Sequence, residues 1–418
     1  MPEVKALSGI EILDSRGRPT VKAYCTLASG VVAQASVPSG ASTGAAEAVE
    51  LRDQESRYRG LGCRKAVANL NEIINDCVSG CDFPSQAGFD AALIALDGTQ
   101  NKSRLGANAI LAASLAFARA SALEANEPLY QHFSRMLPGD MQIPRPTINL
   151  FSGGKHAGAQ VEIQDVLIMP QSPDDLDSSL AMFAEIYACA AELCAERYDM
   201  RLLRADEGGL APPASSAESL IELALAAIDH AGLRAGTDVV LAVDVASSHF
   251  FDGESYHLGG RRLSPEEMIQ RLVRWVNSYP IVSIEDGLAE DDWQHWPRLR
   301  ETLGHRALIL GDDLLCTNPA RIRKAVETQA ANALLLKVNQ IGTLTEAAEA
   351  VRLARVAGWR IVASARSGET EDDWLADLAV GWGADQIKIG SITQSERLSK
   401  YNRLLEITAA VGWPLARP

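Results

Sequence analysis

The stretch IVSIEDGLAE, residues 281–290, carries a short apolar run that ends in a single acidic residue, Glu285. The same pattern recurs in VVLAVDVASS (239–248), which ends its run at Asp244, and in ALILGDDLLC (307–316), which ends it at Asp312. A lysine takes the place of the acid in two more stretches, ALLLKVNQIG (333–342) with Lys337 and DQIKIGS (385–391) with Lys388. Several buried strands, each with one charge at its end, indicate an active site at the mouth of a β/α barrel, because barrel enzymes place their chemistry at the carboxyl ends of the strands.

The five charges are expected to converge on one ligand, since an unpartnered buried charge costs roughly several kcal/mol. Three carboxylates without a histidine favour Mg²⁺ over zinc. Any one of these acids alone is better explained as a helix cap or a partner for an arginine. A lysine beside a divalent ion has a lowered pKa and can act as a general base, so Lys337 is the expected base. It can also pair with one of the acids, and the two interpretations are compatible.

Composition bounds the class of protein. The chain has 418 residues, of which 47% are hydrophobic and 22% charged, as in a globular protein large enough for a barrel and one further domain. We expect neither a membrane span nor a secretory signal, and therefore a cytoplasmic protein. The net charge of −15 argues against a nucleic-acid partner but allows an anionic substrate. The seven scattered cysteines are interpreted as reduced packing residues.

The pattern along the chain predicts an α/β protein of two domains, an N-terminal α+β capping domain over residues 1–135 and a β/α barrel over 140–418. Residues 20–37 alternate as a strand pair, and the alanine-rich stretch 107–125 predicts a helix packed on several sides. Later strand–helix repeats predict parallel strands, and the absence of a dinucleotide-binding glycine motif favours a closed barrel over an open sheet. Ser264 with Glu267, and Thr343 with Glu346, predict helix starts. Gly358 predicts a helix end.

Long motifs carry a resemblance that covers essentially the whole chain. They are EILDSRGRPTV (11–21), VPSGASTGAAEAVELRD (37–53), LDGTQNKSRLGANAILAASLA (96–116), DEGGLAP (206–212), PIVSIEDGL (280–288), GDDLLCTN (311–318), KVNQIGTLTEA (337–347), RSGETED (366–372), and QIKIGS with SERLSKYN (386–402). By these motifs the chain resembles the enolase family. The resemblance implies a small N-terminal domain, a β/α barrel, a homodimer and two magnesium ions.

The resemblance also implies roles for individual residues. The ligands of the family's first metal ion are matched by Asp244, Glu285 and Asp312, and the base that removes the proton from carbon 2 is matched by Lys337. Glu207 matches the acid that assists departure of the carbon-3 hydroxyl, and Lys388 matches the lysine that binds the substrate carboxylate. The remaining matches are Arg366 and Ser367 for the phosphate, Ser39 for the second metal, His156 on a closing loop, and Gln164 beside the acid machinery, where Asp165 follows it.

Several positions depart from the family pattern. Ala365 stands where enolases have a catalytic histidine, and Asp165 stands where they have glutamate. Ser152, His249 and Ile389 are also changed, of which Ser152 and His249 are consistent with neutral drift. Ala365 and Asp165 both fall on the leaving-group side, where loss of an acid–base partner costs ~10²–10⁴-fold in rate. His156 and His249 are the candidates to fill the space beside Ala365.

Three hypotheses follow for function. The leading one is a specialised paralogue that acts on 2-phosphoglycerate or phosphoenolpyruvate-like compounds in phosphonate natural-product biosynthesis, with a phosphorylated or phosphonylated carboxylate substrate and a nucleotide-activated co-substrate. The second is an ordinary phosphopyruvate hydratase with compensating changes. The third is a non-catalytic enolase-fold binding protein, which the retained metal ligands and lysines make the least favoured.

Overall fold

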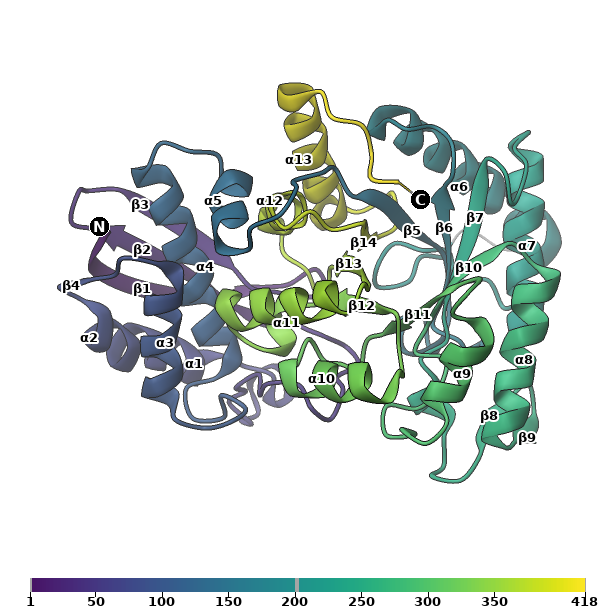
Figure 1. The fold of residues 1–418 in the computed structure, drawn as a ribbon, viewed down its shortest axis with the longest axis horizontal. Helices are drawn as coiled ribbons and strands as arrows, with labels where there is room; N and C mark the ends of the chain where they lie inside the picture. Colours follow the sequence, from purple (N-terminus) through teal and green to yellow (C-terminus); the bar gives the residue numbers. More distant parts are fainter. Residues whose placement is uncertain (1, 200–202, 418) are drawn as a thin grey trace.

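The computed structural model describes residues 2–199 and 203–417, and the chain forms a small N-terminal part and a larger barrel (Figure 1). The N-terminal sheet has the order β3-β2-β1-β4. Its strands are β1 (Glu3–Leu13), β2 (Pro19–Leu27), β3 (Val32–Ser36) and β4 (Cys81–Asp82). The helices of this part are η1 (Arg57–Gly60), α1 (Arg64–Asn69), η2 (Leu70–Ile74), α2 (Asn75–Val78), α3 (Gln86–Asp97), α4 (Ala107–Glu124) and α5 (Leu129–Met136).

The local predictions for this part are confirmed. The alternating stretch forms β2 and β3, which pair antiparallel with Cys25 opposite Ala33. Helix α4 buries most of its residues, because it packs under β2 and β3 and also against α3 and α5. An α+β domain therefore precedes the barrel, as the pattern indicates.

Eight strands close the barrel in the order β10-β11-β12-β13-β14-β5-β6-β7. They are β5 (Arg145–Ser152), β6 (Asp165–Pro170), β7 (Val239–Asp244), β10 (Ile281–Glu285), β11 (Leu308–Gly311), β12 (Ala333–Leu336), β13 (Arg360–Ser364) and β14 (Gln386–Gly390). The helices outside them are α6 (Leu176–Tyr198), α7 (Ala217–His230), α8 (Pro265–Ser278), α9 (Trp296–Leu303), α10 (Pro319–Thr328), α11 (Leu344–Val356), α12 (Trp374–Gly381) and α13 (Ser395–Val411). A hairpin of β8 (Tyr256–Leu258) and β9 (Arg261–Leu263) precedes α8.

The expectation of uniformly parallel strands is wrong for β6, which runs antiparallel to both β5 and β7. A parallel return requires a crossover that is usually a helix, but residues 153–164 contain only the short turn η3 (Gly154–His156). The chain therefore turns back directly into β6. As a result the first residue of β6, Asp165, lies at the same barrel edge as the carboxyl end of β7, where it is paired with Asp244.

Side-chain caps fix where the barrel helices begin. Ser264 accepts a hydrogen bond from the amide of Glu267, and the Glu267 side chain accepts one in return, which completes the predicted capping box of α8. The Thr343 side chain accepts a hydrogen bond from the amide of Glu346 and so caps the start of α11. Gly358 follows the end of α11 with a φ of +74°. Each N-cap contributes about 1 kcal/mol and fixes the residue at which its helix begins.

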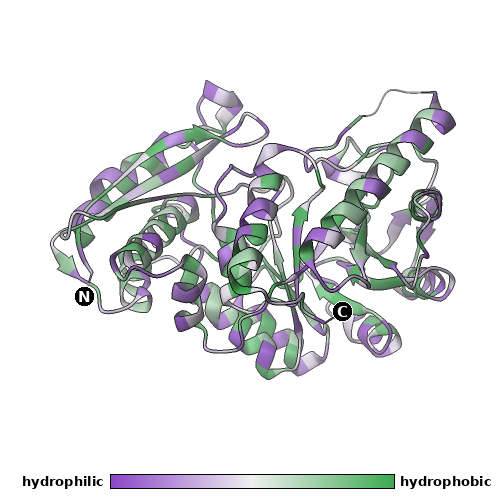
Figure 2. Ribbon diagram, turned by 90° about the horizontal axis from the view of Figure 1, so that it is seen from above, coloured by the Kyte–Doolittle hydropathy of each residue, from purple (hydrophilic) through white to green (hydrophobic). Residues whose placement is uncertain are grey.

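Apolar residues fill the barrel and the helix faces that pack on it. Figure 2 shows hydrophobic and hydrophilic segments alternating along the helices, as expected for helices with one buried face. Among the described residues, α6 alone is long and apolar enough by composition to cross a membrane, yet it packs against α7 and β5. All seven cysteines are free, as expected, but Cys81 is exposed, so the packing interpretation is wrong for it.

Candidate active site

The strand-end charges meet at one edge of the barrel. Asp244 and Glu285 are register partners on β7 and β10, so their side chains point to the same side of the sheet. Lys388, from β14, joins them: its Nζ donates to Asp244 Oδ2 at 2.9 Å and to both carboxylate oxygens of Glu285 at 2.8 Å. All three side chains are buried. The sequence prediction that these charges converge is therefore confirmed by their positions.

Lys337 and Asp312 form the second half of the cluster. Lys337 Nζ lies 2.5 Å from Asp312 Oδ2, and Gln340 Nε2 donates to the other oxygen, Asp312 Oδ1, at 2.8 Å. Gln340 stands in the turn η5 (Val338–Gln340), directly after Lys337. The strand-end lysine therefore lies against the third acid, in the salt bridge that the sequence analysis allowed.

The three acids supply oxygen donors of the kind that a divalent cation prefers. Burial and the charge of Asp244 raise the pKa of Glu285 well above its usual value, despite the two nearby lysines. Burial also opposes ionisation of Asp244, but Lys388 outweighs it and lowers the Asp244 pKa to about 2. Gln164 donates to Asp244 through Nε2 at 3.1 Å, while its buried Oε1 has no hydrogen-bond partner. The chain thus gathers more buried carboxylate oxygen than its own lysines neutralise, which is the donor chemistry that Mg²⁺ prefers.

Without a metal ion, the pKa of Lys337 is raised, whereas a lowered pKa is expected beside a cation. Burial lowers the pKa of this lysine, but the attraction of Asp312 outweighs burial and raises it above the ordinary value. A lowered pKa would therefore have to come from a cation that competes for Asp312.

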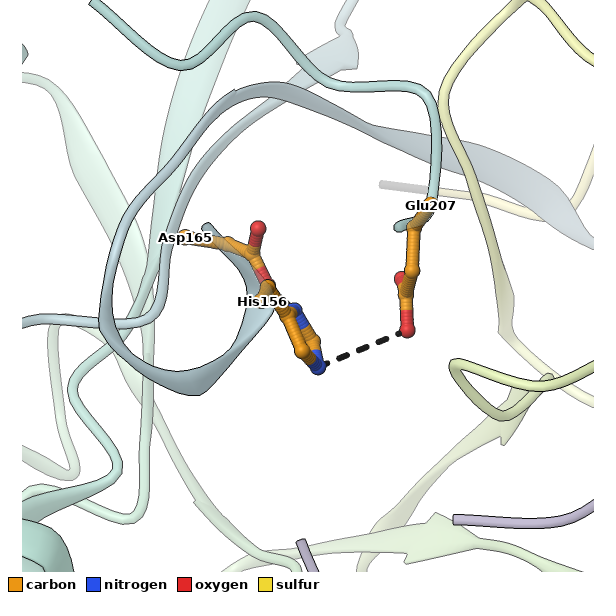
Figure 3. Close-up of side chains that lie close together, drawn as sticks. All are labelled: His156, Asp165 and Glu207. Atoms are coloured by element: carbon orange, nitrogen blue, oxygen red, sulfur yellow. Dashed lines mark hydrogen bonds and ion pairs between the residues drawn. The ribbon is translucent and has the colours of Figure 1, made fainter. Parts of the chain in front are cut away.

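A second cluster contains a histidine between two carboxylates (Figure 3). His156 Nδ1 lies 2.9 Å from Asp165 Oδ2, and His156 Nε2 lies 3.6 Å from Glu207 Oε1. Glu207, in the loop between α6 and α7, also accepts a hydrogen bond from Asn149 Nδ2 at 3.0 Å. All three members of the cluster are buried. The structure therefore brings Asp165 and Glu207, expected on the leaving-group side, together with His156, expected on a closing loop.

The carboxylates hold this histidine in its charged form. Burial disfavours the imidazolium, but Asp165 and Glu207 outweigh burial and raise the pKa of His156 to about 9. Burial likewise works against ionised Glu207, and His156, Arg397 and Lys388 together lower its pKa. At neutral pH the cluster contains an imidazolium that can donate through both ring nitrogens.

Arg366 and Ser367, the residues expected at the phosphate, belong to the barrel, and the N-terminal part supplies several of their partners. Both terminal nitrogens of Arg366 lie 3.1 Å from the carboxylate oxygens of Glu47, in a two-point ion pair. Arg366 also donates to Asn339 Oδ1 and to the Ser42 carbonyl, each at 2.9 Å. Ser367 Oγ accepts a hydrogen bond from Arg16 at 3.1 Å. The guanidinium is thus rigidly held, and the strap of residues 38–47 lies directly over it.

Ser39 lies apart from the acids, whereas Ala365 lies beside Lys388. Ser39 Oγ accepts from Arg52 at 2.7 Å and donates to Glu50 at 3.1 Å, so its hydroxyl contacts none of the three strand-end carboxylates. Ala365 is buried directly after β13, and its amide donates to the Lys388 carbonyl at 2.9 Å. The altered position therefore lies beside Lys388, at the same barrel edge as the acids.

Sequence reasoning missed two residues of the site, Ser152 and Glu47. Ser152 is no neutral change, because its Oγ donates to Asp165 Oδ1 at 2.5 Å. Glu47 escaped notice because its partner Arg366 is 319 residues away in the sequence. His249, one of the two candidates for the space beside Ala365, is half-buried in η4 (Ser247–Phe250), and its buried Nδ1 has no hydrogen-bond partner among the described residues. Burial and nearby Lys155 lower its pKa to about 4, so His249 is neutral.

The comparison with protein families agrees with this architecture. The model for the enolase C-terminal TIM barrel domain matches residues 140–414, and the model for the enolase N-terminal domain matches residues 4–133. Together these matches span nearly the whole chain, and the barrel match alone covers more than half of it. The chain therefore belongs to the enolase family and is an enolase-like enzyme.

Proposed function

We propose that the enzyme is a magnesium-dependent member of the family that acts on 2-phosphoglycerate or phosphoenolpyruvate-type substrates, specialised for phosphonate natural-product biosynthesis. The observation that carries the magnesium-dependent part is the cluster of three buried carboxylates with the buried Lys388 and the part-buried Lys337 at the barrel mouth. So many charges are expensive to keep together in a protein without a ligand for them.

Each half of the site has its own task in this proposal. Asp244, Glu285 and Asp312, at the carboxyl ends of β7, β10 and β11, would hold Mg²⁺, which, when bound, supplies positive charge to the substrate carboxylate as a proton leaves carbon 2. Lys337 takes that proton through its unprotonated Nζ. Lys388 pairs with the substrate carboxylate, Arg366 binds the phosphate, and Ser39 turns toward a second ion. A planar guanidinium suits a phosphate because it can donate two parallel hydrogen bonds.

The specialisation rests on the leaving-group side. Ala365 offers no hydrogen bond where the family has a histidine, and Asp165 has a shorter carboxylate than the family's glutamate. Both changes leave the base Lys337 and the strand-end acids untouched. A larger co-substrate, such as a nucleotide-activated phosphonoformate, is the partner that we propose for this altered side.

The direct test is an assay of purified enzyme with magnesium on two substrates. We expect slow ultraviolet-detected phosphoenolpyruvate formation from 2-phosphoglycerate, and faster consumption of phosphoenolpyruvate-type substrate together with a phosphonoformate derivative. Dehydration in the ordinary enzyme range of roughly 1–10³ per second, without any reaction of phosphonoformate derivatives, would overturn the specialisation.

Ala365→His supplies a second test of the same point. If the missing histidine limits dehydration, the variant gains about 10²-fold or more in phosphoenolpyruvate formation, the low end of what an acid–base partner contributes. Ala235→His adds the same side chain at an exposed position outside the site and serves as the matched control. An unchanged rate in Ala365→His would favour the ordinary hydratase.

The pH dependence should report His156. Because Asp165 and Glu207 raise its pKa from 6.5 to about 9, the turnover that needs the imidazolium is expected to be constant through neutral pH and to fall above about pH 9. The same shift contributes stability that is fully present below pH 6.5 and is lost as the pH rises through 9. A pH–rate profile checks this, with His156→Gln as the variant that lacks the limb. A limb near pH 6.5 in the unmodified enzyme would contradict it.

Phosphopyruvate hydratase remains a second candidate, favoured by one observation. The contacts of His156 with Asp165 and Glu207 keep a charged acid on the leaving-group side, so one donor for a departing hydroxyl persists without a histidine at position 365.

We also propose a homodimer. Exposed apolar side chains Ile10, Leu13 and Val32 lie on β1 and at the start of β3, and a cavity of about 520 Å³ lined by Leu13, Arg119 and Glu371 opens beside them. A second copy of the chain would cover this apolar surface. Light scattering should give twice the chain mass, and a monomer at micromolar concentration would contradict the proposal.

A further inference from the structure

Ser152 and Asp165 lie opposite each other on two neighbouring strands of the barrel. They are register partners at the ends of the antiparallel pair β5 and β6, so their side chains leave the sheet side by side. Ser152 Oγ donates to Asp165 Oδ1 at 2.5 Å, and both residues are fully buried. Directly opposed side chains of such a pair have Cβ atoms about 5 Å apart, a gap that these two short side chains bridge with one hydrogen bond.

The second oxygen of Asp165 is also used. Asp165 Oδ2 accepts from His156 Nδ1 at 2.9 Å, so the carboxylate is held from two directions. A carboxylate with one fixed oxygen cannot rotate freely about its terminal bond, and its other oxygen then fixes the plane of the imidazole. The ring nitrogen on the far side, Nε2, is thereby directed at Glu207, 3.6 Å away.

The surroundings leave Ser152 no alternative position. A Cβ on Gly209 would lie 2.6 Å from Ser152 Oγ, so the backbone of that loop packs directly on the hydroxyl. The Ser152 amide donates to the Leu210 carbonyl, and the Ser152 carbonyl accepts from Gln160 Nε2 at 2.9 Å. Glu207 belongs to the same loop as Gly209 and Leu210, so Ser152 lies between the strand that carries Asp165 and the loop that carries Glu207.

We propose that Ser152 is a positioning residue, which acts through Asp165 to hold His156 Nε2 toward Glu207. The proposal rests on the function proposed for the leaving-group side and adds to it a requirement for the hydroxyl at position 152. Without the hydroxyl, the short carboxylate of Asp165 loses one of its two anchors. The imidazole can then turn, and a misplacement of about 1 Å in a catalytic group can cost about 100-fold in rate.

A double-mutant cycle tests whether Ser152 acts through Asp165. Ser152→Ala is expected to lower kcat about tenfold and to leave KM within about twofold, as expected for the loss of one hydrogen bond to a charged group. Asp165→Asn should lower kcat further, and the double variant should match Asp165→Asn alone. An equal loss from Ser152→Ala in both backgrounds, or no loss in the unmodified enzyme, would overturn the proposal.

A matched control separates positioning from stability. Ser179 is equally buried and its hydroxyl is also hydrogen-bonded, to the Asp175 carbonyl at 2.8 Å, but it lies on α6 outside the site. Ser179→Ala should lower the melting temperature as much as Ser152→Ala while leaving kcat unchanged. If both variants lost the same activity, Ser152 would have only a structural role.

A measurement without substrate keeps the inference separate from the proposed function. In ¹⁵N-histidine NMR spectra of the full chain, Ser152→Ala should shift and broaden the His156 ring signals, which a His156→Gln variant identifies, and Ser179→Ala should leave them unchanged. If no substrate turned over, the proposed function would fail while this measurement still tested the hydrogen-bond chain. Unchanged His156 signals in Ser152→Ala would reject the chain itself.

Discussion

Lys337→Met is expected to lower turnover by about 10²–10⁴-fold, the range that general bases contribute. Lys337 is a part-buried lysine directly after β12, and its Nζ lies against Asp312. Methionine keeps most of the volume but cannot accept a proton, so abstraction at carbon 2 stops while the rest of the site remains folded. Exchange of the carbon-2 proton with deuterated solvent, followed by NMR, measures this step apart from all later ones.

The control for that variant is Lys324→Met, which removes the same charge from an exposed position on α10. It should exchange the proton at the unmodified rate. Undiminished exchange in Lys337→Met would show that another group is the base, and the role proposed for Lys337 would have to be withdrawn.

Glu285→Gln is expected to have different effects on thermal stability in the absence and in the presence of magnesium. Burial and Asp244 raise the pKa of Glu285 well above 4.5, so ionising this group costs the folded state free energy at any pH above 4.5. The neutral amide avoids that cost. We therefore expect the variant without magnesium to unfold at the same temperature as the unmodified protein or above it.

Magnesium should reverse the order. An ion that binds only the folded state stabilises it by about 2.7 kcal/mol at a concentration of 100 Kd, and the variant should lose most of this gain together with its activity. Thermal unfolding with and without magnesium measures both effects, and Glu301→Gln, on the exposed face of α9, is the control. An equal magnesium-induced shift in Glu285→Gln would exclude Glu285 as a ligand.

The strand ends could be predicted because the information is local. Each apolar run stops at its charged residue, and parallel pairing then places Asp244 opposite Glu285 without further assumptions. The start of a helix, such as that of α8 at Ser264, could be predicted equally well, since the capping residue and its partner lie within one turn. The convergence of the strand-end acids on the lysines followed from the strand ends and their pairing.

The antiparallel β6 and the pairs that cross the chain could not be predicted in this way. The direction of β6 depends on how residues 153–164 fold back, and that stretch has no period of its own. The ion pair between Glu47 and Arg366 depends on how two domains pack. Ser152 was missed because a single serine in an apolar strand gives no signal until its cross-strand partner is known.

The ion pair between Glu47 and Arg366 limits how freely the barrel can be combined with other N-terminal domains. Arg366 is 3% exposed and its partner Glu47 is 8% exposed, and they belong to opposite ends of the gene. A new N-terminal segment that covered Arg366 without supplying a carboxylate would leave a desolvated guanidinium without its counter-charge, a defect that costs about 3–5 kcal/mol. Domain shuffling is therefore constrained at this contact: any new N-terminal partner must bring a carboxylate to the same point.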